Sequence, residues 1–145
     1  MAMKASDILH AKGTEVMTVR PTETLERLSH RLRMARVGAL VVSRDGRTIE
    51  GIVSERDIVH CMAERGAACL SAPVETAMTR RVITCEPESS IASVMKTMTA
   101  NRIRHLPVVE GGNLAGIVSL GDVVKARLDE MELEAGVLRD LAMSH

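Results

Sequence analysis

The stretch Gly51-Ile-Val-Ser-Glu-Arg-Asp-Ile-Val59 returns, almost unchanged, as Gly116-Ile-Val-Ser-Leu-Gly-Asp-Val-Val124. The two copies lie 65 positions apart and agree at six of nine residues. Chance does not account for such a match at a fixed spacing, so the chain contains one structural unit used twice. Each copy places a Ser and an Asp three residues apart, and we expect the function to depend on that pair.

The similarity continues upstream of the two matching stretches. Residues 16–42 align with residues 82–108 at an offset of 66, so the offset changes by one before the stretches quoted above. The change falls where Asp45-Gly46 in one copy corresponds to Gly111-Gly112 in the other. Both dipeptides are typical of tight turns, which tolerate a one-residue difference. An open solenoid needs at least three units, so two copies indicate a closed pair with pseudo-two-fold symmetry.

The composition is that of a globular protein without a preference for polyanions. Of the 145 residues, 46% are hydrophobic and 26% are charged, which suits one domain or two small ones that share a core. Lys+Arg and Asp+Glu both number 19, so no general attraction to nucleic acid or an anionic membrane is expected. No apolar run reaches the roughly 18 residues of a membrane span, and the N-terminus lacks the apolar stretch of a signal peptide. We predict a cytoplasmic location, with neither nucleic acid nor membrane as a partner.

Neither a metal site nor a catalytic centre is expected. Cys61, Cys69 and Cys85 make an odd count without a C-x-x-C spacing, and we expect three small buried thiols. The five histidines are scattered, without the paired spacing of metal ligands. Motifs of nucleophilic catalysis are missing, so we predict that the protein is not an enzyme. The chain contains no Phe, Tyr or Trp, so a bound base would lie between aliphatic side chains.

Each repeat predicts the order strand, helix, strand, strand, helix. In the first copy we expect strands at 16–19, 37–42 and 49–53, a helix capped by Thr24, and a helix over 54–65. In the second copy we expect strands at 82–85, 103–109 and 114–118, a helix over 90–100 ended by a left-handed Asn101, and a helix from Ser119 onwards. We predict an N-terminal helix and linker (1–15), a first repeat (16–65), a connecting segment (66–81), a second repeat (82–127) and a C-terminal helical extension (128–145).

The last helix carries apolar residues at alternating spacings of four and three. This heptad seam consists of Val124, Leu128, Met131, Ala135, Leu138 and Ala142. It is too short to establish a coiled coil by itself. Two interpretations remain open: the helix packs on its own domain, or it contacts a second subunit.

The repeated Ser-x-x-Asp motif, Ser54 to Asp57 and Ser119 to Asp122, has two interpretations. It can be a capping box, in which the Ser hydroxyl and the Asp carboxylate satisfy each other's backbone N–H groups. It can also be a binding site, because a helix N-terminus attracts phosphate and a carboxylate can accept both hydroxyls of a ribose. The Gly that opens each strand would leave room for close approach of a ligand.

The two copies differ in the basic residues near this motif. Arg104 and His105 precede a strand of the second copy, where the first copy has Gly38-Ala39. Arg can bind phosphate with two hydrogen bonds, and His can donate one. The alternative is that Arg104 and His105 are solvated edge residues. Arg56 in the first motif corresponds to Gly121 in the second, so we expect two sites that differ in charge and affinity.

These residues resemble a pair of cystathionine-β-synthase (CBS) domains, also called a Bateman module. The resemblance covers residues 16–60 and 82–127, and it depends on Arg102-Ile-Arg-His-Leu-Pro-Val-Val109 followed by Gly116-Ile-Val-Ser-Leu-Gly-Asp122. It implies an α+β fold of βαββα repeats, packed as a pseudo-two-fold pair with flanking N- and C-terminal helices. It also implies a homodimer.

The resemblance further implies an adenine nucleotide ligand, AMP, ATP or NAD(H), bound in clefts between the repeats. The ribose would be held by Asp57 and Asp122. The ribose or phosphate would be reached by Ser54, Ser119, Arg56, Arg104 and His105, and the adenine would lie near Thr18, Thr84, Ala39 and Leu40. The function implied is regulatory, with the signal passing through the oligomer or to a separate effector protein. The alternative is an interaction scaffold whose clefts are vestigial.

Overall fold

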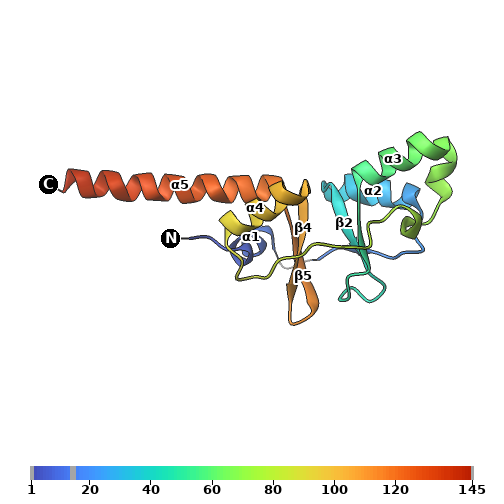
Figure 1. Cartoon of the computed structure of the whole chain (residues 1–145), viewed down its shortest axis with the longest axis horizontal. Helices are drawn as coiled ribbons and strands as arrows, with labels where there is room; N and C mark the ends of the chain where they lie inside the picture. The colour runs from blue at the N-terminus through green and yellow to red at the C-terminus, as the bar shows by residue number, and fades with distance from the viewer. Residues whose placement is uncertain (1, 14–15, 145) are drawn as a thin grey trace. The chain divides into compact units, whose positions relative to one another are not determined.

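The structure is a computed structural model that describes residues 2–13 and 16–144. The chain divides into two compact units, each built around one repeat (Figure 1). The first-repeat unit holds residues 16–83 and 111–115, and the second-repeat unit holds residues 2–13, 84–110 and 116–144. The N-terminal segment therefore belongs to the second repeat, although it precedes the first in the sequence.

The first-repeat unit contains a three-stranded sheet whose strands and helices share one core. Strand β1 (Thr18–Val19) runs parallel to β2 (Ala39–Val42), which runs antiparallel to β3 (Gly51–Ser54). The helices are α2 (Leu25–Ala35), α3 (Glu55–Arg65) and the short 3₁₀ helices η1 (Gly66–Ser71) and η2 (Val74–Thr76). The core consists of Val19, Leu25, Leu28, Leu32, Leu40, Val42, Val53, Ile58, Cys69 and Val74.

Local sequence explains why these elements form. Thr24 caps α2, because its side chain accepts a hydrogen bond from the Arg27 N–H at 3.2 Å. Leu25, Leu28 and Leu32 follow at helical spacing and are all buried. Strand β2 is buried along its whole length, which agrees with its uninterrupted apolar sequence.

The second-repeat unit contains a two-stranded sheet and three helices. Strand β4 (His105–Glu110) pairs with β5 (Asn113–Ser119), of which residues 116–119 are counted in this unit. The helices are α1 (Ala5–Lys12), α4 (Ile91–Asn101) and α5 (Leu120–Met143). Within this unit, the C-terminal half of α5 extends beyond α1 and α4 (Figure 1). The buried residues of α5, Val123, Ala126 and Glu130, all lie in its first half.

The heptad seam predicted on α5 does not pack on its own unit. All six of its residues are exposed, and Leu138 is 67% exposed. The first half of α5 does pack on its own unit, as one interpretation expected, but it does so through residues beside the seam and not through the seam itself. The helix is anchored instead by the residues between the seam positions, including Glu130, whose Oε2 accepts a hydrogen bond from the Met3 N–H at 2.9 Å.

The strand predicted at residues 82–85 is also wrong. Cys85 forms an isolated parallel bridge with Val108, where its N–H donates to the Pro107 carbonyl at 2.9 Å and its own carbonyl accepts from the Val109 N–H at 2.8 Å. This bridge lies where the repeat places the pair of Val19 and Val42 in the first copy. Pro107 has no N–H to donate, so the pairing cannot extend to Thr84 as it does to Thr18 in the first copy.

The left-handed position after α4 lies one residue later than predicted. Asn101 is the last residue of the helix, and Arg102 has φ 54°. The first copy has the same feature at Arg36, with φ 56°. In both copies the next N–H, of Val37 or Ile103, bonds back to the carbonyl five residues before it at 3.1 or 3.0 Å. This bonding pattern fixes the left-handed residue regardless of the neighbouring Asn.

The N-terminal segment bonds to the second repeat in the same way as the connecting segment bonds to the first. The Ala72 carbonyl accepts from the first N–H of α2, and the Met3 carbonyl accepts from the first N–H of α4, both at 3.0 Å. Isolated bridges join Thr24 to Pro73 and Lys4 to Ser90. The two segments are therefore a further part of the duplication, with corresponding residues 69 positions apart.

These two segments also occupy the space beside the glycine that opens each motif. A Cβ on Gly51 would lie 2.7 Å from the Met78 sulfur and 2.9 Å from the Thr79 carbonyl oxygen. A Cβ on Gly116 would lie 2.5 Å from a methyl group of Leu9. The glycines leave room for the chain's own side chains, and the expectation that they leave room for a ligand is wrong.

The cysteines are only partly as expected. Cys69 is buried, whereas Cys61 and Cys85 are half-buried. Cys61 packs against the edge of the first-repeat core, where the remaining face of α3 is open to solvent. Burial, together with the nearby Glu86 carboxylate, raises the pKa of the Cys85 thiol to about 11.

Candidate functional site

Both Ser-x-x-Asp motifs form capping boxes at the start of a helix. Ser54 and Asp57 open α3: the Ser54 N–H donates to Asp57 Oδ2 at 2.8 Å, and Ser54 Oγ accepts from the Asp57 N–H at 3.4 Å. Ser119 and Asp122 open α5 with corresponding distances of 2.9 and 3.1 Å. The capping interpretation is thus confirmed in both copies. It does not remove the binding interpretation, because each helix N-terminus still offers its positive dipole end.

The two Asp carboxylates have different neighbours. The Oδ2 atom of Asp57 also accepts from its own motif, from Ser54 Oγ at 3.1 Å. The Oδ2 atom of Asp122 instead accepts from Lys12 Nζ, at the end of α1, at 2.8 Å. Burial on its own would raise the pKa of Asp122, but the Lys12 ammonium and the Ser119 N–H outweigh it and hold that pKa below its ordinary value.

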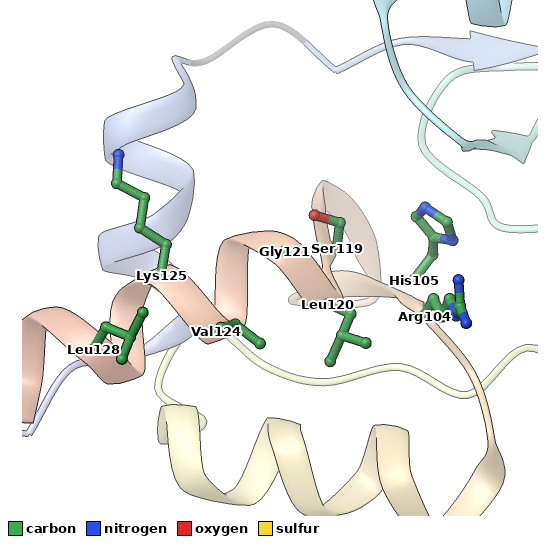
Figure 2. Close-up of a pocket in the computed structure, with 8 residues that line it drawn as sticks. All are labelled: Arg104, His105, Ser119, Leu120, Gly121, Val124, Lys125 and Leu128. Atoms are coloured by element: carbon green, nitrogen blue, oxygen red, sulfur yellow. The ribbon is translucent and has the colours of Figure 1, made fainter.

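A pocket opens beside the start of α5, within the second-repeat unit. Its volume is about 540 Å³, and it is lined by Arg104, His105, Ser119, Leu120, Gly121, Val124, Lys125 and Leu128. Figure 2 shows Arg104 and His105 beside each other at the start of β4, next to Ser119 and Leu120. The Leu120 N–H donates to the Arg104 carbonyl at 2.8 Å, which fixes this backbone against the first turn of α5. The structure brings Arg104, His105 and Ser119 together at this pocket, whereas Asp122 is not among its lining residues.

The charges around this pocket favour an anion. Arg104 and Lys125 are cationic, and the eight lining residues include no Asp or Glu. The N-terminus of α5 adds the positive end of a helix dipole. Leu120, Val124 and Leu128 supply an apolar wall along α5. A ligand with one anionic group and one apolar ring fits this combination.

The same backbone arrangement occurs in the first repeat with other side chains. The Glu55 N–H donates to the Gly38 carbonyl at 3.0 Å, as Leu120 does to Arg104. Ala39 stands in the place of His105, and it is paired with Ser54 in the β2–β3 ladder. Arg56 is exposed on the first turn of α3. The two sites thus share a framework and differ in charge.

The remaining predicted residues lie in varied surroundings. Thr18 is half-buried on β1, and Thr84 is exposed just before the Cys85 bridge. Ala39 and Leu40 are 1% and 3% exposed, and Leu40 belongs to the hydrophobic core. Sequence reasoning missed Lys12 and the α5 residues Leu120, Val124, Lys125 and Leu128. Val124 and Leu128 were visible as members of the heptad seam, but nothing in the sequence pairs Lys12 with Asp122 across such a long separation.

No helix among the described residues is long and apolar enough to cross a membrane. Within residues 2–13 and 16–144, no group of three or more His, Cys, Asp or Glu side chains is placed to hold a metal ion.

Comparison with known sequences gives a consistent family. The model of the CBS domain matches the chain twice, over residues 5–64 and 74–129. The chain is 34% identical over 133 residues to the mitochondrial CBS domain-containing protein CBSX3 of Arabidopsis thaliana, covering 86% of this chain and 65% of that protein. It is 33% identical over 137 residues to an uncharacterized 17.7 kDa protein of Acidianus ambivalens, covering 94% of this chain and 80% of that one.

Solved structures agree with the sequence comparison. The CBS-domain containing protein ATU1752 from Agrobacterium tumefaciens matches with a TM-score of 0.83 and 44% identity, covering 88% of this chain and 95% of that one. The CBS domain pair of protein MJ0100, solved with 5′-methylthioadenosine and S-adenosyl-L-methionine, has the same fold at a TM-score of 0.78 and 22% identity, covering 90% and 99%. The CBS pair is a known regulatory module. The present chain belongs to the CBS-domain family and carries two CBS domains.

Proposed function

We propose that this protein is a regulatory module that binds an anionic adenosyl ligand of the AMP, ATP or NAD(H) class. The observation that carries the proposal is the pocket at the start of α5, where Arg104 and Lys125 accompany a helix N-terminus and an apolar wall. The family relationship adds support, because the related pair of MJ0100 was solved with two adenosyl compounds. A cationic pocket favours the phosphorylated members of this ligand class.

In this proposal each repeat contributes one ribose-binding carboxylate, Asp57 or Asp122. Ser54 and Ser119 lie beside them and reach the ribose or phosphate. Arg104 and His105 bind phosphate in the second-repeat unit, and Arg56 does so in the first. Thr18, Thr84, Ala39 and Leu40 provide the surroundings of the adenine, chiefly through backbone groups, because Ala39 and Leu40 have little exposed side chain.

The response to the ligand passes to other chains. The exposed apolar face of α5 provides a contact for a homodimer in a cytoplasmic protein, and a separate effector protein receives the signal. The ligand shifts the conformational equilibrium only by its difference in affinity for the two states. The protein itself performs no catalysis in this proposal.

A second candidate is a ligand-free interaction scaffold. It is favoured by the two capping boxes, which are complete without any ligand, and by the exposed apolar residues of α5. The two candidates differ in whether a nucleotide stabilises the folded protein.

Melting of nucleotide-free protein tests the proposal. The chain has no Trp or Tyr, so retained nucleotide is visible as an absorbance band near 260 nm and its removal can be verified. A ligand at about 100 times its Kd adds roughly 2.7 kcal/mol to the free energy of unfolding. We expect millimolar AMP, ATP, NAD or NADH to raise the Tm.

The matched control is the double variant Arg104→Gly, His105→Ala, which installs the residues of the first copy. It should retain the fold and show a smaller rise in Tm. If none of the four nucleotides shifts the melting of the unmodified protein, the scaffold function replaces the proposed one.

A further inference from the structure

Lys12, the last residue of α1, forms an ion pair with the carboxylate of Asp122. Its Nζ lies 2.8 Å from Asp122 Oδ2 and donates a second hydrogen bond to the Ile117 carbonyl at 3.1 Å. Both acceptors flank the junction of β5 and α5. The ammonium therefore binds the same carboxylate that, in the proposed function, binds the ribose.

In the described part of the first repeat, no cation pairs with the corresponding carboxylate, that of Asp57. The spacing of 69 residues that relates Leu9 to Met78 places Arg81 in the position of Lys12. Arg81 is exposed, and among the residues that the structure describes Asp57 forms no ion pair. Its Oδ2 accepts instead from the N–H and the hydroxyl of Ser54, inside its own capping box.

Hydrogen-bond capacity turns this difference into a difference in binding. A ribose is held most firmly when its two hydroxyls donate to both oxygens of a carboxylate. Each oxygen has two lone pairs, and Oδ2 of Asp122 already accepts from Lys12 and from the Ser119 N–H, which the start of the helix holds in place. Oδ2 of Asp57 also accepts twice, but one of its donors is the Ser54 hydroxyl, which can rotate away at little cost. A ribose that engages both oxygens of Asp122 must therefore displace the ammonium, whereas at Asp57 it need only turn a hydroxyl.

We propose that Lys12 acts as an intramolecular competitor for the Asp122 site, and that it lowers the affinity of this site for the ribose of the ligand. This inference rests on the proposed function and adds a specificity-determining residue to it. Because α1 is also held by its buried Ala5 and Ile8, displacement of the Lys12 side chain does not require the helix to leave. The competitor can turn away while the fold stays intact.

Calorimetric titration with AMP tests the inference on nucleotide-free protein. The variant Lys12→Met keeps the aliphatic length and removes the charge. The matched control is Lys4→Met, because Lys4 flanks the same helix and forms an ion pair with Glu88, at 2.6 Å, that does not touch Asp122. Loss of a partly exposed ion pair should tighten AMP binding about fivefold in Lys12→Met and leave Lys4→Met within about twofold of the unmodified protein.

The outcomes separate this inference from the proposed function. Tighter binding by Lys12→Met alone, or binding by this variant where the unmodified protein shows none, supports the inference. Unchanged binding overturns it, and weaker binding overturns it by assigning Lys12 to the ligand phosphate. Absence of AMP binding in every variant overturns it as well, but the proposed function falls only if ATP, NAD and NADH also leave the melting unchanged.

Discussion

The two repeats of this chain share a backbone plan and differ in the charges placed on it. In both, a Ser-Asp capping box opens a helix. The first residue of that helix donates its N–H to the carbonyl of the residue just before a strand, Glu55 to Gly38 and Leu120 to Arg104. The second repeat adds Arg104, His105 and Lys125, and it pairs Asp122 with Lys12. Duplication has preserved the backbone hydrogen bonds that make the fold, while the side chains outside those bonds have diverged in charge.

The largest difference between the repeats is expected at the glycines that open the motifs. Gly51→Ala should lower the free energy of unfolding by about 2 kcal/mol, because the new Cβ meets the Thr79 carbonyl as well as the Met78 side chain. Gly116→Ala should cost about 1 kcal/mol or less, because it meets only the flexible end of Leu9. Chemical denaturation of both variants measures the difference.

The double variant Leu9→Ala, Gly116→Ala is the control for the second repeat. If Leu9 is the obstacle, the two substitutions will be non-additive, and the double variant will be more stable than the sum of the single changes predicts. Equal losses of stability for Gly51→Ala and Gly116→Ala would contradict this comparison, because the atoms that meet the two new Cβ groups would then be equally rigid.

A smaller effect is expected from the pH dependence of Asp122. Its folded-state pKa is lowered, so its contribution to stability is present above the unfolded-state pKa and is lost as the pH falls through the folded-state pKa. The stability advantage of the unmodified protein over Asp122→Asn should therefore be largest near neutral pH and shrink in acid. The part due to the partly exposed Lys12 pair is below about 1 kcal/mol.

Denaturation curves at pH 7 and at steps down to about pH 3 give this measurement. In a Lys12→Met background the same substitution should produce a smaller pH-dependent difference. A difference that is constant with pH would contradict the lowered pKa, and an undiminished pH dependence in the Lys12→Met background would contradict the Lys12 ion pair as a cause of it.

The smallest effect is expected at Cys85, which stands where the first repeat has Val19. Both residues make the same parallel backbone pairing with the neighbouring strand. Cys85→Val should therefore change the free energy of unfolding by less than about 1 kcal/mol, since it copies a side chain accepted by the other repeat. A large loss would show that the surroundings of the two positions have diverged more than their backbones.

The sequence was sufficient for the features that depend on local chemistry. The capping boxes, the Thr24 cap and the buried strand β2 follow from residue type and spacing, and the duplication identified the CBS pair. The strand expected at residues 82–85 failed because a single proline in the partner strand ends the ladder. The end of α4 was misplaced by one residue because a backbone hydrogen bond, rather than Asn101, selects the left-handed position.

The features that the sequence did not predict depend on contacts between distant segments of the chain. The equivalence of the N-terminal and connecting segments is a match of hydrogen bonds, since Met3 and Lys4 share no residue type with Ala72 and Pro73. Lys12 reaches Asp122 across 110 positions of sequence. Such a pairing is set by the path of the chain in three dimensions, so residue patterns alone could not reveal it.

The inequality of the two sites is the central claim, and nucleotide-free protein titrated calorimetrically with AMP tests it most directly. The variants Asp57→Ala and Asp122→Ala each remove one proposed ribose carboxylate, and circular dichroism verifies that each retains its helices. The account predicts that the two substitutions weaken AMP binding to clearly different extents. Equal losses of affinity, or no loss in either variant, would contradict it.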